Sequence, residues 1–174
     1  MHPNAHRIET LYAAIAKGDA DAAAACYADD SYFEDIAFRR HGRKEIHEMW
    51  RMVCHAEPVV TFGSVIADDQ RGSGRWTADY MFGKIDNPPG RPVVNDSTSE
   101  FTFRDDGLIA THHDRCDAKA WARQAYPPPK SFLAGSIAPL RRLAAACKLR
   151  KFLKAHPRRR PGSRPHSEGD HDGR

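Results

Sequence analysis

One stretch decides how the fold is interpreted: Asp105-Asp106-Gly107-Leu108-Ile109-Ala110-Thr111-His112-His113-Asp114-Arg115-Cys116-Asp117. It follows the alternating run Glu100-Phe101-Thr102-Phe103, and its glycine supplies the positive φ that a tight turn needs. The two runs therefore predict a β-hairpin. The returning strand of this hairpin carries an unusual set of polar side chains.

His112 and Asp114 share one face of that strand, because side chains alternate with a period of two. The partner strand has one face with Asn95, Ser97, Ser99, Phe101 and Phe103, and another with Asp96, Thr98, Glu100 and Thr102. The second face is the more polar one, so we expect the first to face the interior. Two titratable groups over an apolar floor would have perturbed pKa values and could carry chemistry. The alternative is a histidine exposed at the strand's end, with Asp114 in an ordinary ion pair.

Charge is distributed unevenly along the 174 residues, a length that fits one domain. Residues 1–117 hold 13 Lys and Arg against 20 Asp and Glu, net −7. Residues 118–167 hold 13 basic side chains and no acidic one. The overall charge of +4 therefore hides an acidic domain followed by a basic extension.

The four cysteines, Cys26, Cys54, Cys116 and Cys147, have no close spacing, and the first residues lead directly into a helical pattern. Reduced cysteines in the cytoplasm are the simpler interpretation. No apolar run approaches the roughly 18 to 20 residues that span a bilayer. We therefore expect a cytoplasmic protein without a membrane span.

Periodicity and turn residues predict three helices followed by a sheet. We expect helices at 5–17, 19–27 and 43–55, a strand or extended arm at 31–38 and a turn at 39–42. Strands should follow at 59–66, 74–82 and 93–104, with the last strand after Gly107. This order indicates an α+β domain with helices on one face of the sheet, over residues 5–126. Residues 127–155 should form a Pro-rich linker and a basic amphipathic helix interrupted near Pro139, and 156–174 a disordered basic tail.

Several short motifs stand in a recognisable order: Tyr32-Phe33-x-Asp35, Gly42 before the third helix, Trp76-x-Ala78-x-Tyr80, Gly90-Arg91-x-Val93-x-Asn95, and Ile109-x-x-His112-x-Asp114-x-x-Asp117 with Trp121. Over about residues 5–126 the chain resembles the nuclear transport factor two-like superfamily. Within it, the pattern is similar to SnoaL-like and ketosteroid-isomerase-like small bacterial proteins.

The resemblance implies a cone: a strongly curved sheet wrapped against three helices around a deep pocket, often dimerising through the sheet. In the family's enzymes, carboxylates and histidines move protons at a carbon next to a carbonyl. By position, His112 and Asp114 correspond to the polar pair on the closing strand, and Asp35 to the acidic residue near the mouth. Asp114 or Asp35 would be the base, with His112 as its partner, and Tyr80 or Asn95 would hold an oxyanion. The apolar walls would come from Tyr12, Tyr32, Trp50, Phe62, Trp76 and Phe101.

Other chemistries have less support in the sequence. Asp35, His41, His112 and Asp114 would suit zinc, but no HExxH or CxxC spacing accompanies them. No Gly-x-Ser-x-Gly elbow and no phosphate-binding glycine loop occur, so we expect neither a metal nor a cofactor.

Two function hypotheses remain. One is an isomerase, cyclase or hydratase-like enzyme that acts on an apolar carbonyl compound of steroid or polyketide type. The alternative is a non-catalytic ligand-binding or protein-interaction module. For the basic helix at 131–155 we favour docking on its own domain or on a dimer mate over an anionic membrane surface, and a membrane over nucleic acid.

Overall fold

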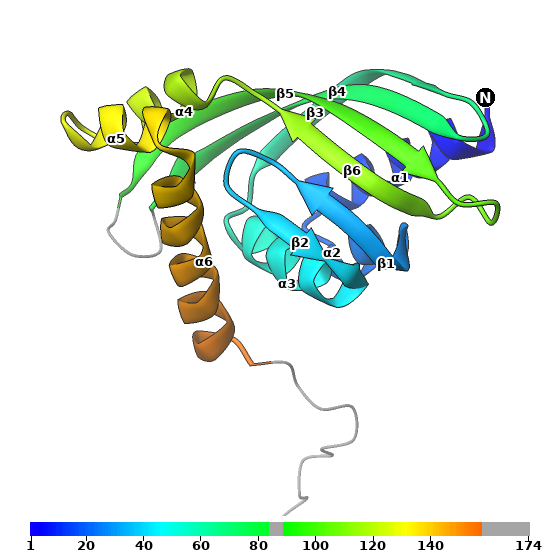
Figure 1. Cartoon of the computed structure of the whole chain (residues 1–174), viewed down its shortest axis with the longest axis horizontal. Coiled ribbons are helices and arrows are strands. Elements are labelled where there is room, and N and C mark those ends of the chain that lie inside the picture. The colour runs from blue at the N-terminus through cyan, green and yellow to red at the C-terminus, as the bar shows by residue number, and fades with distance from the viewer. Residues whose placement is uncertain (84–88, 158–174) are drawn as a thin grey trace, which may run out of the picture.

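A computed structural model describes residues 1–83 and 89–157, and it shows six strands in one curved sheet (Figure 1). Their order is β2-β1-β6-β5-β4-β3. The bounds are β1 Tyr27–Glu34, β2 Arg39–His41, β3 Val59–Ala67, β4 Arg71–Phe82, β5 Arg91–Phe103 and β6 Ile109–Arg115. The last four strands are consecutive and antiparallel, whereas β1 pairs with β6 in parallel. The predicted α+β class is confirmed.

Three N-terminal helices pack against one face of this sheet: α1 (Pro3–Ala16), α2 (Ala20–Ala25) and α3 (Gly42–His55). Asp19 begins α2 as predicted, because its carboxylate accepts the backbone N–H of Ala22 at 2.9 Å. The apolar sides of α1 and α3 and the inward side of the sheet form the main core. Its fully buried members include Ile8, Leu11, Ile15, Phe33, Ile46, Met49 and Ile109.

A second apolar cluster lies at the end of the sheet where α4 (Ala118–Ala125) follows β6. Asp117 caps α4, accepting the N–H groups of Lys119 and Ala120 at 2.8 and 3.0 Å. The buried members of the cluster are Val93, Trp121, Ala122 and Ala125, and Ile36, Tyr80, Phe82, Tyr126 and Ala134 pack around them. The helices after β6 therefore cover an end of the sheet that the first three helices leave open.

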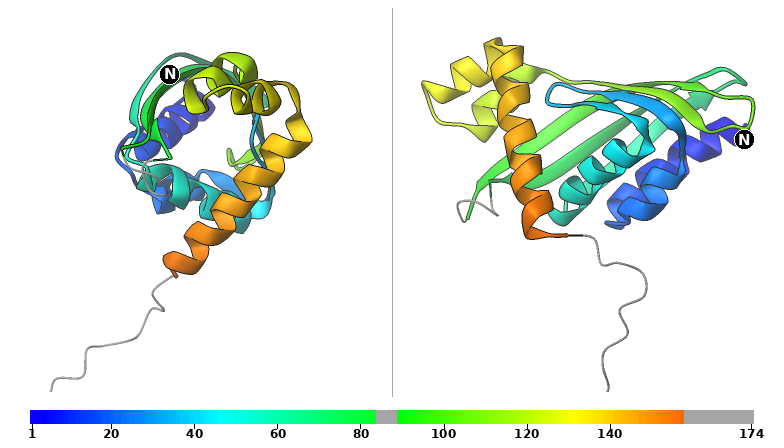
Figure 2. Two further views of the ribbon diagram at one scale, coloured as in Figure 1. Left: turned by 90° about the vertical axis from the view of Figure 1, so that its left-hand side faces the viewer. Right: turned by 60° about the horizontal axis from the view of Figure 1, so that its bottom comes forward.

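The basic extension forms two helices, α5 (Lys130–Ser136) and α6 (Ala138–Ala155). They are separated next to Pro139, which has no N–H and therefore suits the first turn of a new helix. From there α6 runs back across the domain (Figure 2). Leu149 and Phe152 of α6 join the main core, and Arg51 of α3 donates to the carbonyl of His156 at 2.6 Å. No helix of residues 1–83 and 89–157 combines the length and the apolarity of a membrane span.

The chain between α2 and α3 differs from the expectation. β1 starts at Tyr27, inside the predicted second helix, and residues 39–41 form a strand where a turn was predicted. The turn lies instead at residues 35–38, because the Asp35 carboxylate accepts the backbone N–H groups of Ala37 and Phe38 and folds the chain back. The predicted tail at 156–174 lies outside the described residues except for its first two.

Candidate functional site

His112 and Asp114 lie inside the cone, on the inward side of β6. The exposed fraction of His112 is 0%, and that of Asp114 is 9%. The imidazole Nε2 and the carboxylate Oδ1 are 2.8 Å apart. The antiparallel register places Phe101 beside His112 and Ser99 beside Asp114, so the inward side of β5 forms the floor on which this pair rests.

His112 has a partner on each ring nitrogen. The Tyr27 hydroxyl lies 2.7 Å from Nδ1, and the Trp50 indole N–H donates to the same hydroxyl oxygen at 3.3 Å. A carboxylate only accepts, so Nε2 donates to Asp114; in the neutral ring, Nδ1 then accepts from Tyr27. The chain of donors therefore runs from Trp50 through Tyr27 and His112 to Asp114. Burial raises the pKa of Tyr27 well above its ordinary value, which keeps this hydroxyl protonated.

The Asp114 carboxylate receives three hydrogen bonds on a single oxygen. Besides His112, the Ser99 hydroxyl and the Trp76 indole N–H donate to Oδ1, the latter at 3.3 Å. Among the described residues, Oδ2 of Asp114 takes part in none of these bonds. These bonds fix the orientation of His112 and Asp114 through Oδ1 and do not use Oδ2.

Tyr12 of α1 brings a further hydroxyl close to this pair. Its ring lies 6.0 Å from that of Trp76 and 5.4 Å from that of Phe62. Within the described chain its buried oxygen has no hydrogen-bond partner, since the neighbouring Ser99 hydroxyl donates to Asp114. Burial first, and the charge of Asp114 second, raise the pKa of Tyr12. A buried hydroxyl without a partner is costly, so this position is suited to an atom of a ligand or a water molecule.

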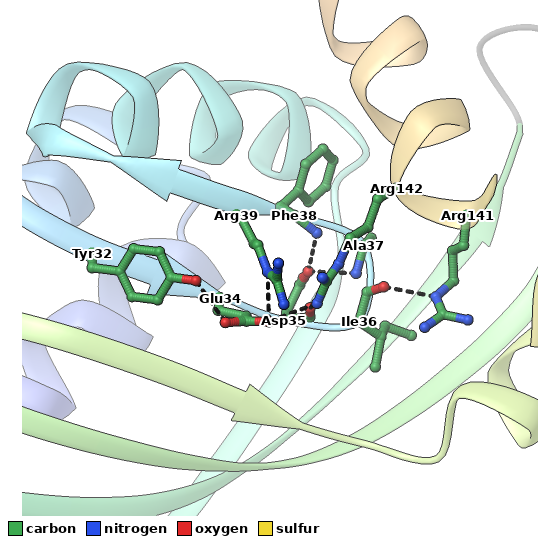
Figure 3. Close-up of polar contacts among 9 residues, drawn as sticks. All are labelled: Tyr32, Glu34, Asp35, Ile36, Ala37, Phe38, Arg39, Arg141 and Arg142. Atoms are coloured by element: carbon green, nitrogen blue, oxygen red, sulfur yellow. Dashed lines mark hydrogen bonds and ion pairs between the residues drawn. The ribbon is translucent and has the colours of Figure 1, made fainter. Parts of the chain in front are cut away.

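Asp35 is the second carboxylate that faces the interior. Burial raises its pKa from 3.8 to about 6, although the N–H groups of Phe38 and Ala37 act in the opposite direction. The charges of Asp114 and His112 also affect it, so the three groups are within electrostatic reach of one another. Figure 3 shows the carboxylate bound by the backbone N–H groups of Ala37 and Phe38 in its own turn. The proton affinity of Asp35 is therefore close to that of a general base working near neutral pH.

Two arginines of α6 hold the turn that carries Asp35 (Figure 3). Arg141, which is 8% exposed, donates through Nε to the carbonyl of Ile36 at 2.7 Å and through a terminal nitrogen to the carbonyl of Ala134 at 2.6 Å. Arg142 donates to Glu34 at 2.6 Å. These contacts tie the turn to both α5 and α6.

Glu34 is shared among several donors, because Arg39 and the Tyr32 hydroxyl bind the same carboxylate at 2.8 and 2.6 Å. The Tyr32 hydroxyl first, and the two arginines with it, lower the pKa of Glu34 to about 2. Glu34 therefore stays ionised and anchors the turn from outside, while Asp35 faces in.

Tyr80 packs against both apolar clusters, and Asn95 donates to the Ser97 hydroxyl at 3.3 Å. The Tyr80 oxygen accepts the Trp121 indole N–H at 2.9 Å, which leaves its own proton free to donate. Burial raises the pKa of Tyr80 to about 12, and the charge of Asp35 adds to this effect. Cys116 is under the influence of Asp35 and Asp114, and burial raises its pKa to about 11. Tyr80 is thus a neutral hydrogen-bond donor within electrostatic reach of Asp35.

Most of the predicted pocket residues lie in or beside the interior, with one clear exception. Trp50, Trp76, Phe101 and Tyr12 surround the His112 pair, and Phe62, 39% exposed, stands at the rim. Tyr32 was wrongly assigned to the pocket wall. Its ring packs against His41 and His113 on the outer side of β1, because alternation turns it away from its buried neighbour Phe33.

Two members of the network, Tyr27 and Ser99, were not among the predicted site residues. Ser99 could have been found, since it shares the inward side of β5 with Phe101. Tyr27 could not have been found, because the Ala-rich run before it predicts a helix that continues through this residue.

The fold agrees with the comparisons. The model of the SnoaL-like domain matches residues 8–112, more than half of the chain. The chain belongs to the SnoaL-like domain family. No curated protein matches it.

Solved structures share the fold of this SnoaL-like protein at low identity. The epoxide hydrolase/cyclase-like enzyme SalBIII, described for pyran ring formation in the polyether salinomycin, has 19% identity and a TM-score of 0.58, over 65% of this chain and 89% of that one. A putative polyketide cyclase from Xanthomonas campestris pv. campestris has 20% identity and a TM-score of 0.59, over 71% of this chain and 97% of that one.

The interior of this SnoaL-like domain is tightly filled around His112. Rings of Phe33, Trp50, Tyr27 and Phe101 lie within 6.5 Å of the imidazole, measured between centroids. Two hollows of the described residues lie elsewhere, between α3 and α6 and on β3–β4 around Phe62. On the Asp35 and Tyr80 side, the inward residues are only partly buried.

Proposed function

We propose that this SnoaL-like domain binds an apolar carbonyl compound of steroid or polyketide type and moves a proton at the carbon next to the carbonyl. The proposal rests on the placement of Asp35, whose carboxylate is held in its turn by the N–H groups of Ala37 and Phe38. It lies there within electrostatic reach of Tyr80 and Asp114, and burial raises its pKa to about 6. A base of near-neutral pKa beside a neutral donor is what enolisation requires. The cyclase names of the two structural neighbours support the same substrate class.

Each polar group has a defined role in the proposed reaction. Asp35 accepts the proton from the carbon, and the electron pair of the C–H bond moves to the carbonyl oxygen as an enolate. The Tyr80 hydroxyl, already held by Trp121, donates a hydrogen bond to that oxygen. Asp35 then returns the proton to a different carbon, which shifts the double bond. Asp114 and His112 fix the inner end of the site, and Oδ2 of Asp114 accepts from a ligand hydroxyl.

The experiment uses β,γ-unsaturated ketones of steroid type, whose conversion to the conjugated isomer is followed by ultraviolet absorbance. Asp35→Asn keeps the shape of the side chain and should lower turnover by roughly 10² to 10⁴-fold with little change in KM. Asp114→Asn serves as the comparison, and Asp117→Asn, at an exposed helix cap, as the control. Unchanged turnover in Asp35→Asn on a ketone that the wild type converts would refute the assignment.

The second candidate is a non-catalytic module of the same fold, and the filled interior around His112 favours it. In that case the Tyr27, His112 and Asp114 network specifies the core and does not touch a ligand. Titration of the tryptophan fluorescence with the same ketones separates the candidates. Saturable quenching without turnover, unchanged in Asp35→Asn, would support the module.

A further inference from the structure

The junction of α5 and α6 leaves an apolar surface uncovered. Five large side chains are exposed there, and we refer to them as the elbow: Phe132 (72% exposed), Leu133 (42%), Ile137 (41%), Leu140 (45%) and Leu143 (63%). The other side of α6 carries the residues that pack on the domain, including Leu149 and Phe152. The elbow is therefore a second apolar side of a segment whose first side is already buried.

Positive charge adjoins the elbow along α6. The exposed side of α6 continues beyond Leu143 with Arg150, Lys151 and Lys154. Residues 118–157 contain nine Lys and Arg and no Asp or Glu. An apolar patch continuous with a cationic one is the pattern of helices that lie in the interface of an anionic bilayer.

We propose that the elbow is a membrane-binding surface whose partner is the headgroup region of an anionic phospholipid bilayer. The apolar side chains enter the boundary between headgroups and acyl chains, and the cations of α6 pair with the lipid phosphates. The two helices need not unfold or leave the domain for this, because the docked side of α6 is opposite.

A second copy of the chain is a poorer partner for the same surface. Five side chains are far fewer than the roughly 20 to 30 residues that each partner contributes to a standard interface. Two-fold pairing would also place the cationic side of one α6 against that of the other, and like charges repel.

Membrane binding would have a consequence for the cone, and this consequence alone depends on the proposed function. Ala134 of α5 packs on the apolar cluster that closes one end of the domain, while Phe132 and Leu133 of the same helix face out. That end lies opposite the N-terminus (Figures 1 and 2). Binding of the elbow to a bilayer would hold the α4–α5 end of the cone at the membrane surface. Apolar carbonyl compounds dissolve in that membrane.

The test is co-sedimentation of the full chain with vesicles of two compositions: phosphatidylcholine alone, and equal parts of phosphatidylcholine and phosphatidylglycerol. We expect sedimentation with the anionic vesicles only, weakened by added salt. Phe132→Ser combined with Leu143→Ser should abolish it. Lys151→Gln and Lys154→Gln should each weaken it about fivefold, since one cation near an anionic surface contributes about that factor.

The matched control is Val59→Ser combined with Ile66→Ser on β3, where both side chains are 69% exposed. The control should bind vesicles as the wild type does when both are compared at concentrations where light scattering shows the same oligomeric state. Equal loss of binding in the control and the elbow variant would overturn the proposal, as would no sedimentation of the wild type. A dimer that the elbow variant dissociates, without vesicle binding, would overturn it in favour of self-association. None of these results depends on a ligand in the cone.

Discussion

Asp35 should make the protein less stable as it ionises, because the folded state binds its proton more tightly than the unfolded chain does. The raised pKa, about 6 against an ordinary 3.8, means that between these values the folded protein holds more protons. The free energy of unfolding must therefore fall as pH rises through this window. At about 1.4 kcal/mol per pKa unit, the ionised carboxylate costs about 3 kcal/mol at neutral pH.

Asp35→Asn removes this dependence while its side-chain oxygen still accepts from Ala37 and Phe38. Urea unfolding of both proteins between about pH 4 and pH 7 should show their stability difference change by about 2.5 kcal/mol in favour of the variant. Two curves that run parallel across this window would refute the argument that Asp35 is held in a desolvated site.

Asp117→Asn supplies a control of opposite sign. The N–H groups of Ala120 and Lys119 lower the pKa of Asp117 at the start of α4. Its contribution to stability is therefore present at neutral pH and is lost as pH falls through the acid range. On acidification, the free energy of unfolding of the wild type should therefore approach that of Asp117→Asn. Relative to Asp35→Asn, by contrast, the wild type should become more stable on acidification.

Three further predictions concern packing and assembly. Arg141→Met should destabilise the protein by about 1–3 kcal/mol and expose α6 to protease, because it leaves the carbonyls of Ile36 and Ala134 unpaired. Arg150→Met, at an exposed position, should change the free energy of unfolding by less than about 0.5 kcal/mol. Gly74→Ala should lower the free energy of unfolding by about 1–3 kcal/mol, because a Cβ there would lie 3.0 Å from the Tyr12 ring. At Gly63 a Cβ would meet nothing within 4 Å, so equal effects of Gly63→Ala and Gly74→Ala would contradict the packing described. We also propose a homodimer through the outer side of the sheet, where Val59, Ile66 and Val94 are exposed: light scattering should report a dimer that Val94→Glu dissociates, and a monomeric wild type would contradict it.

The sheet was predictable because its strands obey a simple rule. Polar residues at Thr98 and Glu100 alternate with Ser99 and Phe101, so the period of two assigns the inward side without further information. The same alternation predicted that the side chains of His112 and Asp114 face the interior. The rule was not applied to Tyr32, which was assigned to the pocket wall from its aromatic character alone, although alternation with the buried Phe33 places it on the outer side.

The turn at Asp35 could not be predicted in the same way. Its position depends on two backbone N–H groups that a carboxylate accepts, and on arginines more than 100 residues further along the chain. No local pattern records such long-range contacts. The hydrogen-bonding role of Tyr27 was hidden for a similar reason, since its partners lie on α3 and β6.

The region that resembles the family and the region that shapes the site do not coincide in this chain. The SnoaL-like match ends at residue 112, yet Arg141 and Arg142 hold the turn that presents Asp35. Removing α6 would free the Ile36 carbonyl and one charged partner of Glu34, and water could then reach the turn. Better solvation would lower the pKa of Asp35 toward its ordinary value and weaken it as a base near neutral pH. The basic extension therefore bears directly on the proposed chemistry, and a relative that lacks it would need another means of keeping this carboxylate dry.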